Sequence, residues 1–413
     1  MKYSRLYRSW LPSMRAVAAW GPGVLVMLAD TDVGNIVTAA QAGVEWGYRL
    51  LPLILALIPL LYLVQELTVR LGIFTGMGFA ELVLHRYGRG WAWLLIGGLV
   101  IATTGSLVTE FTGFAGIGEI YGVPRMATLL LSALALLAIV FLGAYRRVER
   151  VALVIGMFEL AFFAVAWVSH PDLGQMEAHW GDLPWTNHQF LYLGAALIGS
   201  TFNPWMVFYQ QSAMVDKGLD GTDYAAAKWD TAFGAVLTQC LTAAILIAAA
   251  ATLGQSHGQV ELGSVGGISA ALTPILGPQA ARLVFSMGVL GAAMVAAIVS
   301  SLAMAWGVGE VLGLRRRLET EAGRAPWFIF IYASCVITSV LLVWEVPDLV
   351  WLNVATQVAN AFMLPVMVGM LLLLANRALP PAHRLRGAYL WIFLVLALGT
   401  SAIGLWGGVA IFL

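Results

Sequence analysis

Apolar segments of about 20 residues recur roughly every 35 residues along the 413-residue chain, and they constrain its fold more than any other feature. A helix needs about 20 apolar residues to cross the hydrocarbon core of a bilayer. Charged residues make up only 11% of the chain, whereas soluble domains carry about 25%. The sequence therefore predicts an all-α membrane protein and excludes a soluble globular enzyme.

Hydropathy over windows of about 19 residues predicts eleven membrane spans. They cover residues 17–42, 50–72, 91–118, 125–145, 149–169, 188–215, 229–253, 268–312, 327–345, 350–376 and 386–412. The eighth span is too long for one simple crossing, so we expect it to project beyond the bilayer at one end. Residues 17–413 are predicted to form a single transmembrane domain, preceded by a cytoplasmic segment, 1–16.

Basic residues are distributed unevenly between the two sides of the predicted membrane protein. If the N-terminus is cytoplasmic, all 22 Lys and Arg residues lie on the cytoplasmic side except Arg49, Arg125 and Arg282. The positive-inside rule predicts this orientation, and eleven crossings then place the C-terminus outside. We expect the chain in the inner (plasma) membrane of the cell. The formal net charge of zero gives no sign of a nucleic-acid partner.

Two spans carry helix-breaking residues near their middle, and they lie five spans apart. The first span contains DTDVGN at residues 30–35, and the sixth contains GSTFNPW at residues 199–205. Interrupted segments at corresponding positions mark the substrate site of transporters built from inverted repeats. The spacing predicts two inverted five-helix repeats, at about 17–169 and 188–376, and an extra helix at about 386–412.

The first break places acidic and amide side chains at the depth of the bilayer centre. Asp32 and Asn35 are three residues apart, so their oxygens can converge on one point. A carboxylate there costs at least ~2.5 kcal/mol without a partner, and the first span contains no Lys or Arg. We therefore expect Asp32 to bind a cation; the alternative is that it caps the backbone N–H groups freed around Gly34. Asp30 is off this face and is expected to be solvated or paired elsewhere.

A chain of this kind could also be a channel or an intramembrane enzyme. The channel is kept as an alternative. None of the six histidines is expected at mid-membrane depth, and the sequence has neither an HExxH segment nor the serine-histidine arrangement of a protease. A Gly-rich phosphate-binding loop is also missing, which argues against an ATP-driven pump. We expect a carrier that is not an enzyme and needs no cofactor.

The chain resembles the Nramp (natural resistance-associated macrophage protein) family of divalent-metal transporters over nearly its whole length. The matching segments are Gly21-Pro22-Gly23, Asp32-Val33-Gly34-Asn35, Gln65-Glu66-Leu67, residues 71–76, Glu110-Phe111-Thr112-Gly113, Asn203-Pro204-Trp205 and Thr356-Gln357-Val358. The resemblance implies a leucine-transporter-like fold, with two inverted five-helix repeats and an eleventh transmembrane helix. It also implies a divalent metal cation as substrate.

The metal-site residues of the family carry over position by position. The implied metal ligands are the side chains of Asp32, Asn35, Asn203 and Gln357 and the backbone carbonyl of Ser200. Residues implied around the site or along its pathway are Trp205, Thr242, Asn360 and Glu110. Structural alternatives stay open: a helix cap for Asn203, packing for Trp205, an interhelical hydrogen bond for Gln357 and a bond to its own helix for Thr242.

Three positions depart from the pattern of the proton-coupled members. Asn203 replaces a methionine whose thioether favours softer transition metals, and its amide oxygen should weaken selection against Mg²⁺. Trp205 replaces a histidine and Leu107 replaces an acid, and neither side chain can relay a proton. Glu110 remains, with Arg324 as a candidate counter-charge. The altered set resembles the Nramp-related magnesium transporter branch, which implies transport without proton coupling.

Together these features predict a secondary transporter that moves hydrated Mg²⁺, and also Mn²⁺, inward by alternating access. The lipid bilayer is its other expected partner, and a monomer is compatible with the sequence. One alternative is a proton-coupled Mn²⁺/Fe²⁺ symporter of the ordinary Nramp type. Another is a carrier for a small organic cation or an amino acid, in which Trp205 would offer a cation-π surface and Asp32 the counter-ion.

Further acids lie within or near the ends of the predicted spans. Glu66 is expected to pair with Arg70 at i+4. Asp230 and Glu310 are expected to be solvated or to pair with basic residues near the cytoplasmic side. Glu159 is also embedded, and intramembrane acids are functional candidates by default. The basic residues near Asp230 and Glu310 are Lys228 and Arg315.

Overall fold

The computed structural model describes residues 21–141, 154, 156–252, 278–313 and 326–410. Within these ranges the chain forms helices joined by turns and contains no strand. The α-helices are α3 (Pro22–Asp30), α4 (Val33–Trp46), α5 (Leu51–Thr75), α6 (Phe79–Tyr87), α7 (Arg89–Ile120), α8 (Arg125–Phe141), α10 (Ala161–Val168), α11 (Leu173–Trp180), α12 (His188–Thr201), α13 (Pro204–Asp216), α14 (Tyr224–Thr252), α17 (Pro278–Val311), α19 (Pro326–Glu345), α20 (Leu349–Ala378) and α21 (Gly387–Ala410). Two short 3-10 helices are η1 (Met157–Leu160) and η3 (Pro381–His383).

Helices occupy the positions of all eleven predicted spans. Among the described residues, seven stretches are long and apolar enough to cross a bilayer, and α3 with α4 forms an eighth that is bent by 51°. Three shorter apolar helices, at Arg125–Ile139, Met157–Val168 and Ile329–Glu345, lie at the remaining predicted spans. The predicted segment 1–16 and parts of several predicted spans lie outside the described residues. The residues concerned fall within 1–20, 142–153, 155, 253–277 and 411–413.

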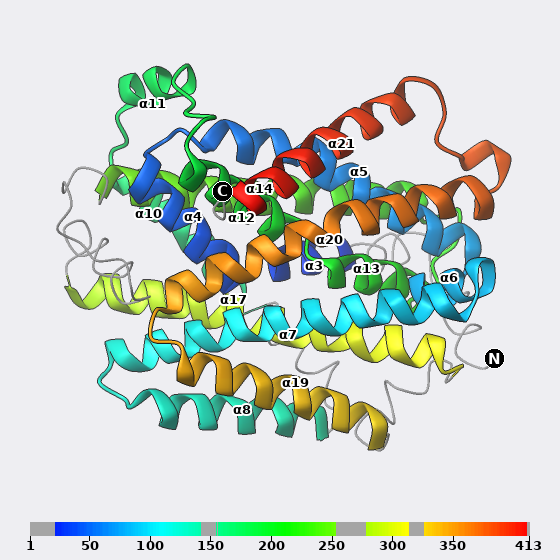
Figure 1. Cartoon of the computed structure of the whole chain (residues 1–413), viewed down its shortest axis with the longest axis horizontal. Helices are drawn as coiled ribbons and strands as arrows, with labels where there is room; N and C mark the ends of the chain where they lie inside the picture. The colour runs from blue at the N-terminus through cyan, green and yellow to red at the C-terminus, as the bar shows by residue number, and fades with distance from the viewer. Residues whose placement is uncertain (1–20, 142–153, 155, 253–277, 314–325, 411–413) are drawn as a thin grey trace.

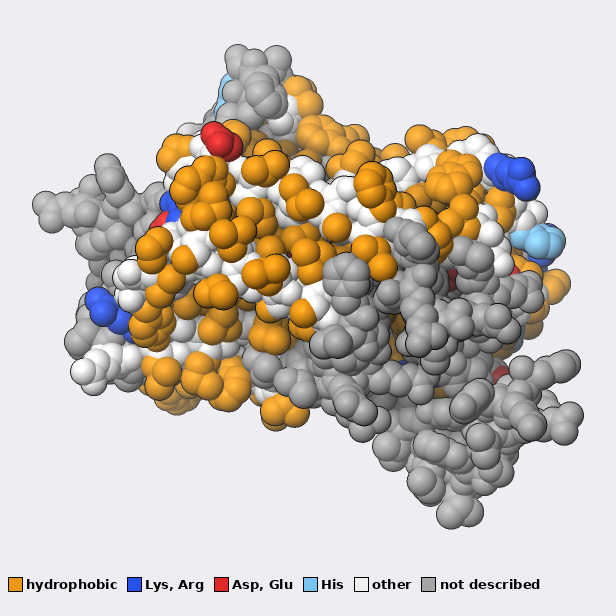
Figure 2. Space-filling view, turned by 90° about the horizontal axis from the view of Figure 1, so that it is seen from below, with side chains coloured by type: hydrophobic (Ala, Val, Ile, Leu, Met, Phe, Trp, Pro, Cys, Tyr) orange, Lys and Arg blue, Asp and Glu red, His pale blue; other side chains and the backbone are white. Residues whose placement is uncertain are grey.

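The outer surface of the helix bundle is suited to lipid. Figure 1 places α8 and α19 side by side at one edge, packed against α7. Figure 2 shows hydrophobic side chains over the middle of this face and charged side chains toward its two ends. Exposed large hydrophobic residues on α8 and α19 include Leu131, Leu134, Phe330 and Leu341. A patch of this size is costly in water but matches lipid tails, as expected of an integral membrane protein.

The two broken spans form the interior of the bundle. In Figure 1, α3, α4, α12 and α13 lie toward the middle of the molecule, where α3 and α4 pack on α14 and α12 packs on α20. The stretch His188–Asp216, which contains α12 and α13, is 100% buried over its most apolar window, whereas Gly387–Ala410 is 22% buried. Irregular backbone at membrane depth is tolerated only where protein or a cavity surrounds it. The breaks satisfy this condition because neighbouring helices enclose them.

Two short helices, α6 and α11, fall outside the predicted spans. α6 follows Gly76, which ends α5 in a left-handed conformation with a φ of 64°. α11 begins after Asp172, whose carboxylate accepts hydrogen bonds from the backbone N–H groups of Gly174 and Gln175. It projects from one end of the bundle (Figure 1). Both helices are too short to cross a bilayer.

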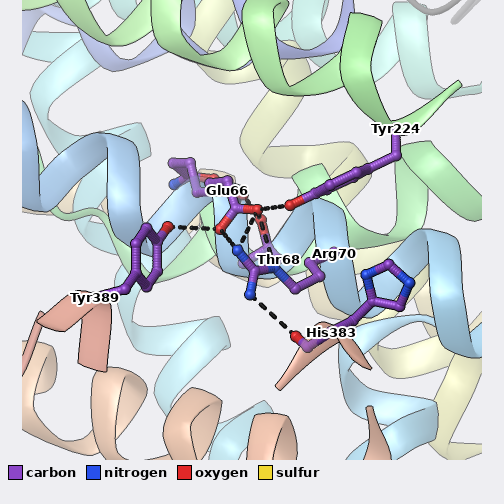
Figure 3. Close-up of polar contacts among 7 residues, drawn as sticks. Glu66, Thr68, Arg70, Tyr224, His383 and Tyr389 are labelled. Atoms are coloured by element: carbon purple, nitrogen blue, oxygen red, sulfur yellow. Dashed lines mark hydrogen bonds and ion pairs between the residues drawn. The ribbon is translucent and has the colours of Figure 1, made fainter. Parts of the chain in front are cut away.

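The pairing of Glu66 with Arg70 that the i, i+4 spacing predicts is confirmed. The Arg70 guanidinium donates to both carboxylate oxygens of Glu66 at 2.8 Å, and the Glu66 side chain is fully buried. Tyr224 and Tyr389 also donate their hydroxyl groups to Glu66, and Arg70 donates to the His383 carbonyl (Figure 3). This buried ion pair therefore joins α5 to α14, η3 and α21.

Asp230 has a different environment from the predicted one. It is fully buried, and its carboxylate accepts hydrogen bonds from the backbone N–H groups of Gly21 at 3.1 Å and Gly23 at 2.6 Å. These N–H groups lie at the N-terminal end of α3, where they lack helical partners. The prediction that Asp230 is solvated or paired with Lys228 is wrong, because the carboxylate fixes the start of the first broken span.

Glu310 makes a similar contact with α6. Its carboxylate accepts hydrogen bonds from the backbone N–H groups of Ala80 at 3.0 Å and Glu81 at 3.2 Å, and from the Ser212 hydroxyl at 2.6 Å. The predicted pairing partner Arg315 lies outside the described residues. Glu310 therefore links α17 to the first turn of α6 and to α13, a role that the sequence analysis does not predict.

Candidate metal site at the two helix breaks

The first break separates α3 from α4 and is built around Asp32. α3 ends at Asp30, α4 begins at Val33, and the two helices are bent by 51°. Asp32 caps α4, because its Oδ1 accepts a hydrogen bond of 2.7 Å from the Asn35 backbone N–H. Its Oδ2 is buried and has no hydrogen-bond partner among the described residues. One oxygen thus serves as the helix cap, and the other is free to bind a cation.

The second break separates α12 from α13 and is built around Asn203. α13 begins at Pro204, whose ring removes a backbone donor and prevents a continuous helix. Asn203 occupies the N-cap position of α13, but its side chain makes no capping bond there. Instead its Nδ2 lies 3.2 Å from the Ser200 carbonyl oxygen and 3.2 Å from Asp30 Oδ1. Asn203 therefore connects the two breaks directly.

α20 brings two more amide side chains to the breaks. Asn360 Nδ2 donates hydrogen bonds to Asn203 Oδ1 at 2.7 Å and to Gln357 Oε1 at 3.0 Å. Gln357 packs tightly against both breaks. A Cβ atom on Gly34 would overlap the Gln357 side-chain amide, and a Cβ atom on Gly199 would overlap the Gln357 backbone carbonyl. Glycine at these two positions is what lets α20 approach so closely. Asn360 thus makes an interhelical hydrogen bond to Asn203, whereas the bond between Asn360 and Gln357 lies within α20.

Thr242 on α14 contacts the other side of the first break. Its hydroxyl lies 2.8 Å from Asn35 Oδ1 and 3.0 Å from the carbonyl of Thr238, one turn earlier on its own helix. The Thr238 hydroxyl in turn lies 2.6 Å from the Thr31 hydroxyl. Thr242 therefore makes the bond to its own helix and also contacts a predicted ligand.

Trp205 and Glu110 are buried with incomplete hydrogen bonding. The indole N–H of Trp205 has no acceptor in the part of the chain that the structure describes. Glu110 Oε1 lies 3.4 Å from the Thr109 hydroxyl, while its Oε2 has no partner there. Arg324, the candidate counter-charge of Glu110, lies outside the described residues. Glu159 on η1 is also fully buried, and neither of its carboxylate oxygens has a described partner.

The predicted site residues share a buried environment that is rich in oxygen. Each of the predicted ligands and pathway residues is at most 4% exposed. None of the ion pairs in the described ranges involves Asp30, Asp32 or Glu110. The C-terminal ends of α3 and α12, which carry partial negative charge, also meet the breaks. The N-terminal ends of α4 and α13, with partial positive charge, meet the same breaks, so the buried carboxylates rather than the helix ends make the region favourable for a cation.

The donors at the breaks are carboxylate, amide and backbone carbonyl groups. Across the described residues, no group of three or more His, Cys, Asp and Glu side chains is placed to hold a metal ion. The two cysteines are free, with Cys335 buried on α19 and Cys240 on α14. A donor set of oxygens without thiolate or imidazole suits Mg²⁺, Ca²⁺ and Mn²⁺ better than softer ions.

Asp30 is a buried acid beside the predicted ligands that the sequence analysis leaves outside the ligand set. It is fully buried and accepts a hydrogen bond from Asn203, so of its two expected environments solvation is wrong and pairing with another residue is what the structure shows. The expectation of solvation treats the first span as a continuous helix, whereas α3 ends at Asp30 and the chain turns before Val33. A usable signal is present in the sequence, because two acids share an apolar span without any basic residue.

The bundle is thus a polytopic helical membrane protein whose two broken spans enclose a buried, oxygen-rich site, an arrangement typical of secondary transporters. Residues 23–410 match the sequence model of the Nramp family, described as natural resistance-associated macrophage protein-like. The chain therefore belongs to the Nramp family.

Curated relatives and solved structures agree with this assignment. The divalent metal cation transporter MntH of Agrobacterium fabrum is 30% identical over 307 residues, which cover 70% of this chain and 65% of that protein. The MntH of Xanthomonas campestris pv. campestris is 26% identical over 420 residues, covering 95% of this chain and 91% of that protein. These relatives are transporters, in agreement with the expectation that the chain is not an enzyme.

Two solved structures define the fold. The manganese transporter of Eremococcus coleocola superposes with a TM-score of 0.73 at 20% identity, covering 95% of this chain and 86% of that one. Mhp1, a nucleobase-cation-symport-1 family transporter, superposes with a TM-score of 0.62 at 14% identity, covering 95% and 90%. The leucine-transporter-like fold implied by the resemblance is confirmed.

Proposed function

We propose that this chain carries divalent metal cations across its membrane by alternating access, with hydrated Mg²⁺ and also Mn²⁺ as substrates. The observation that carries the proposal is the juxtaposition of Asp32, Asn35, Asn203 and Gln357 at two enclosed helix breaks. Relatives named as divalent metal cation transporters and a structural neighbour named as a manganese transporter support the substrate class.

The choice of Mg²⁺ follows from the donor atoms. At the second break Asn203 offers an amide oxygen, a hard donor that gives no preference for a softer ion. Mg²⁺ dehydrates reluctantly and usually keeps several waters. Amide and hydroxyl groups such as those of Asn360 and Thr242 are suited to hold such waters around the ion.

Transport without proton coupling follows from the residues beside the site. Leu107 and Trp205 are both fully buried, and neither can bind and release a proton. The gradient of the ion and the membrane potential would supply the driving force, because a divalent charge crossing the whole field gains about 4.6 kcal/mol per 100 mV. The buried carboxylates of Glu110 and Glu159 favour the second candidate, a proton-coupled Mn²⁺/Fe²⁺ symporter, since each has an oxygen without a described partner.

For the topology, we propose a cytoplasmic N-terminus, an external C-terminus and a place in the inner (plasma) membrane. The support is the concentration of Lys and Arg in the segments that this orientation places inside. Within the single transmembrane domain, the two inverted repeats would cover about 17–169 and 188–376. Each repeat would then contribute one of the two broken helices.

Uptake into proteoliposomes with a magnesium indicator and a pH indicator in parallel tests the proposal. The native chain is compared with Asp32→Asn, Asp32→Ala and the control Glu119→Gln, which changes a partly exposed surface carboxylate. Magnesium entry without acidification, lost in both Asp32 variants and kept in the control, is the expected result. Manganese entry accompanied by protons would instead support the symporter, and no entry of any divalent ion would leave the organic-cation carrier as the better proposal.

A further inference from the structure

We propose that Asp30 is a second carboxylate ligand of the transported cation, acting beside Asp32, so that the site carries two negative charges. The inference rests on the proposed function and adds to it a residue that sets charge selectivity. It is drawn from the position of Asp30 at the first break, from its contact with Asn203 and from its free oxygen.

Asp30 is placed where a cation is favoured. It is the last residue of α3, and the Thr31 backbone N–H bonds back to the carbonyls of Met27 and Leu28. The carbonyl end of a helix carries partial negative charge, and half-helix C-termini coordinate cations in broken-helix transporters. The side chain is fully buried, so it does not leave this region for solvent.

The contact with Asn203 holds Asp30 at the site and leaves one of its oxygens free. Asn203 Nδ2 donates to Asp30 Oδ1 at 3.2 Å, and Asp30 Oδ2 is buried without a partner in the described ranges. Asn203 Oδ1 already accepts a hydrogen bond of 2.7 Å from Asn360. In this conformation Asp30 Oδ2 is wholly free to ligate, Asn203 Oδ1 keeps one lone pair for the ion, and Asn203 Nδ2 holds the Asp30 carboxylate beside it.

The charges of the two carboxylates lead to the same assignment. Asp30 and Asp32 are both fully buried, each with a free Oδ2, and no ion pair of the described residues neutralises either one. Two like charges close together repel each other, and buried charges need a partner to avoid a large desolvation cost. A divalent cation neutralises both carboxylates at once, and a monovalent cation leaves one uncompensated.

Binding measurements on the purified full-length chain in lipid nanodiscs test this assignment, using Mg²⁺ and Mn²⁺ alone as probes. Asp30→Asn keeps the shape and the oxygen that accepts from Asn203, but it removes the charge. The control is Glu119→Gln, which removes a partly exposed carboxylate at the surface. We expect Asp30→Asn to weaken both affinities by about 10- to 100-fold, the range seen when groups around a metal are removed, and the control to bind within about twofold of the native chain.

The outcomes separate this inference from the proposed function. Native affinity in Asp30→Asn, or an equal loss in Glu119→Gln, would overturn the ligand assignment while leaving the transport proposal in place. Absence of Mg²⁺ and Mn²⁺ binding by the native chain would overturn both. If Asp30→Asn does not fold, Asp30→Cys provides a second test: a thiolate ligand should raise the Cd²⁺ to Mg²⁺ affinity ratio at least tenfold, and an unchanged ratio contradicts the proposal.

Discussion

The Thr242 hydroxyl lies 2.8 Å from Asn35 Oδ1 and connects α14 to the first turn of α4. The Asn35 backbone N–H donates to Asp32 Oδ1. The backbone of Asn35 is therefore held by Asp32, and its side-chain oxygen by Thr242. The single hydroxyl hydrogen is shared between Asn35 Oδ1 and the Thr238 carbonyl, and at least one lone pair of Asn35 Oδ1 stays free for a cation. Thr242 is therefore expected to orient Asn35 toward the ion.

Replacing Thr242 with valine should weaken metal uptake without unfolding the protein. Thr242→Val keeps the shape but removes the hydrogen bond to Asn35, and we expect the KM for Mg²⁺ to rise about 10-fold. The control is Thr252→Val on the same helix, because its hydroxyl bonds only backbone carbonyls one turn earlier. Concentration-dependent uptake into proteoliposomes measures both, and an equal KM in the two variants would contradict an orienting role.

Exchanging the Asn203 amide for a thioether should change ion selectivity. Asn203→Met removes the bonds to Asp30 and Asn360 and offers sulfur in their place. Softer ligands favour softer ions, so we expect the ratio of Cd²⁺ to Mg²⁺ uptake to increase at least 10-fold. The ratio is obtained by measuring how strongly Cd²⁺ and Mg²⁺ each inhibit Mn²⁺ uptake. A ratio equal to that of the native chain would reduce Asn203 to a packing residue.

Gly199→Ala should disrupt the contact between α12 and α20. The added Cβ would overlap the Gln357 backbone carbonyl, which cannot rotate away as a side chain can. Overpacking of this kind costs about 1–3 kcal/mol, so both Tm and uptake should fall. The control is Gly369→Ala on α20, where nothing lies within 4 Å of the added atom. Thermal unfolding of the two detergent-solubilised variants measures the difference in Tm. Equal Tm values for Gly199→Ala and Gly369→Ala would show that α12 and α20 can move apart at little cost in stability.

Much of the fold could be predicted because the bilayer fixes the length of an apolar helix. The breaks were predictable as well, since Pro204 and Gly34 stand inside long apolar runs. The short helices α6 and α11 could not be predicted in this way. α6, for example, depends on capping by Glu310, a residue more than 220 positions away along the chain.

Partners of the buried acids were the least predictable part of the site. Sequence proximity suggested Lys228 for Asp230, yet its carboxylate bonds to backbone N–H groups 207 and 209 residues away. The bond of Asp30 to Asn203 is not predictable from a helical face, because α3 ends at Asp30 and Asn203 lies at the other break. Glu66 and Arg70 were predictable because their contact lies within one continuous helix. Local geometry thus predicts pairs inside an element, and only the packed bundle defines pairs between elements.

Removing the Tyr389 hydroxyl should destabilise the protein by loosening α21 from α5 (Figure 3). Tyr389 donates to Glu66 Oε2 at 2.8 Å, and its ring lies 5.4 Å from the Arg70 guanidinium carbon. Tyr389→Phe keeps the ring contact and loses a hydrogen bond to a charged group, which costs about 1.5–3 kcal/mol. Glu66→Gln leaves Arg70 without its counter-charge and should cost more, about 3–5 kcal/mol. The control is Tyr121→Phe, at an exposed tyrosine. We expect Tm to be lowest in Glu66→Gln, intermediate in Tyr389→Phe and unchanged in the control. Any other order would contradict the role of the Glu66 hydrogen bonds.

Mild acid should weaken the contact between α11 and the end of α4. His179 Nδ1 accepts a hydrogen bond of 3.3 Å from the Tyr48 backbone N–H, which requires a neutral ring. Partial burial and the nearby Arg49 charge lower the pKa of His179 below its ordinary value of 6.5. Because the unfolded chain then binds the proton more readily, this contact contributes its full stability above about pH 6.5 and loses it as the pH falls toward the folded pKa.

The neighbouring ion pair titrates in a different range and allows the two effects to be separated. Arg49 and Asp182 approach to 2.5 Å, and the hydrogen bond and charge of Arg49 lower the pKa of Asp182 below 3.8. The stability from this pair is therefore kept above about pH 4 and lost only in stronger acid. Tm measured between about pH 7.5 and 5 should decline in the native chain and in the control His188→Gln, and should stay flat in His179→Gln. A decline of equal size in His179→Gln would assign the acid sensitivity to another group.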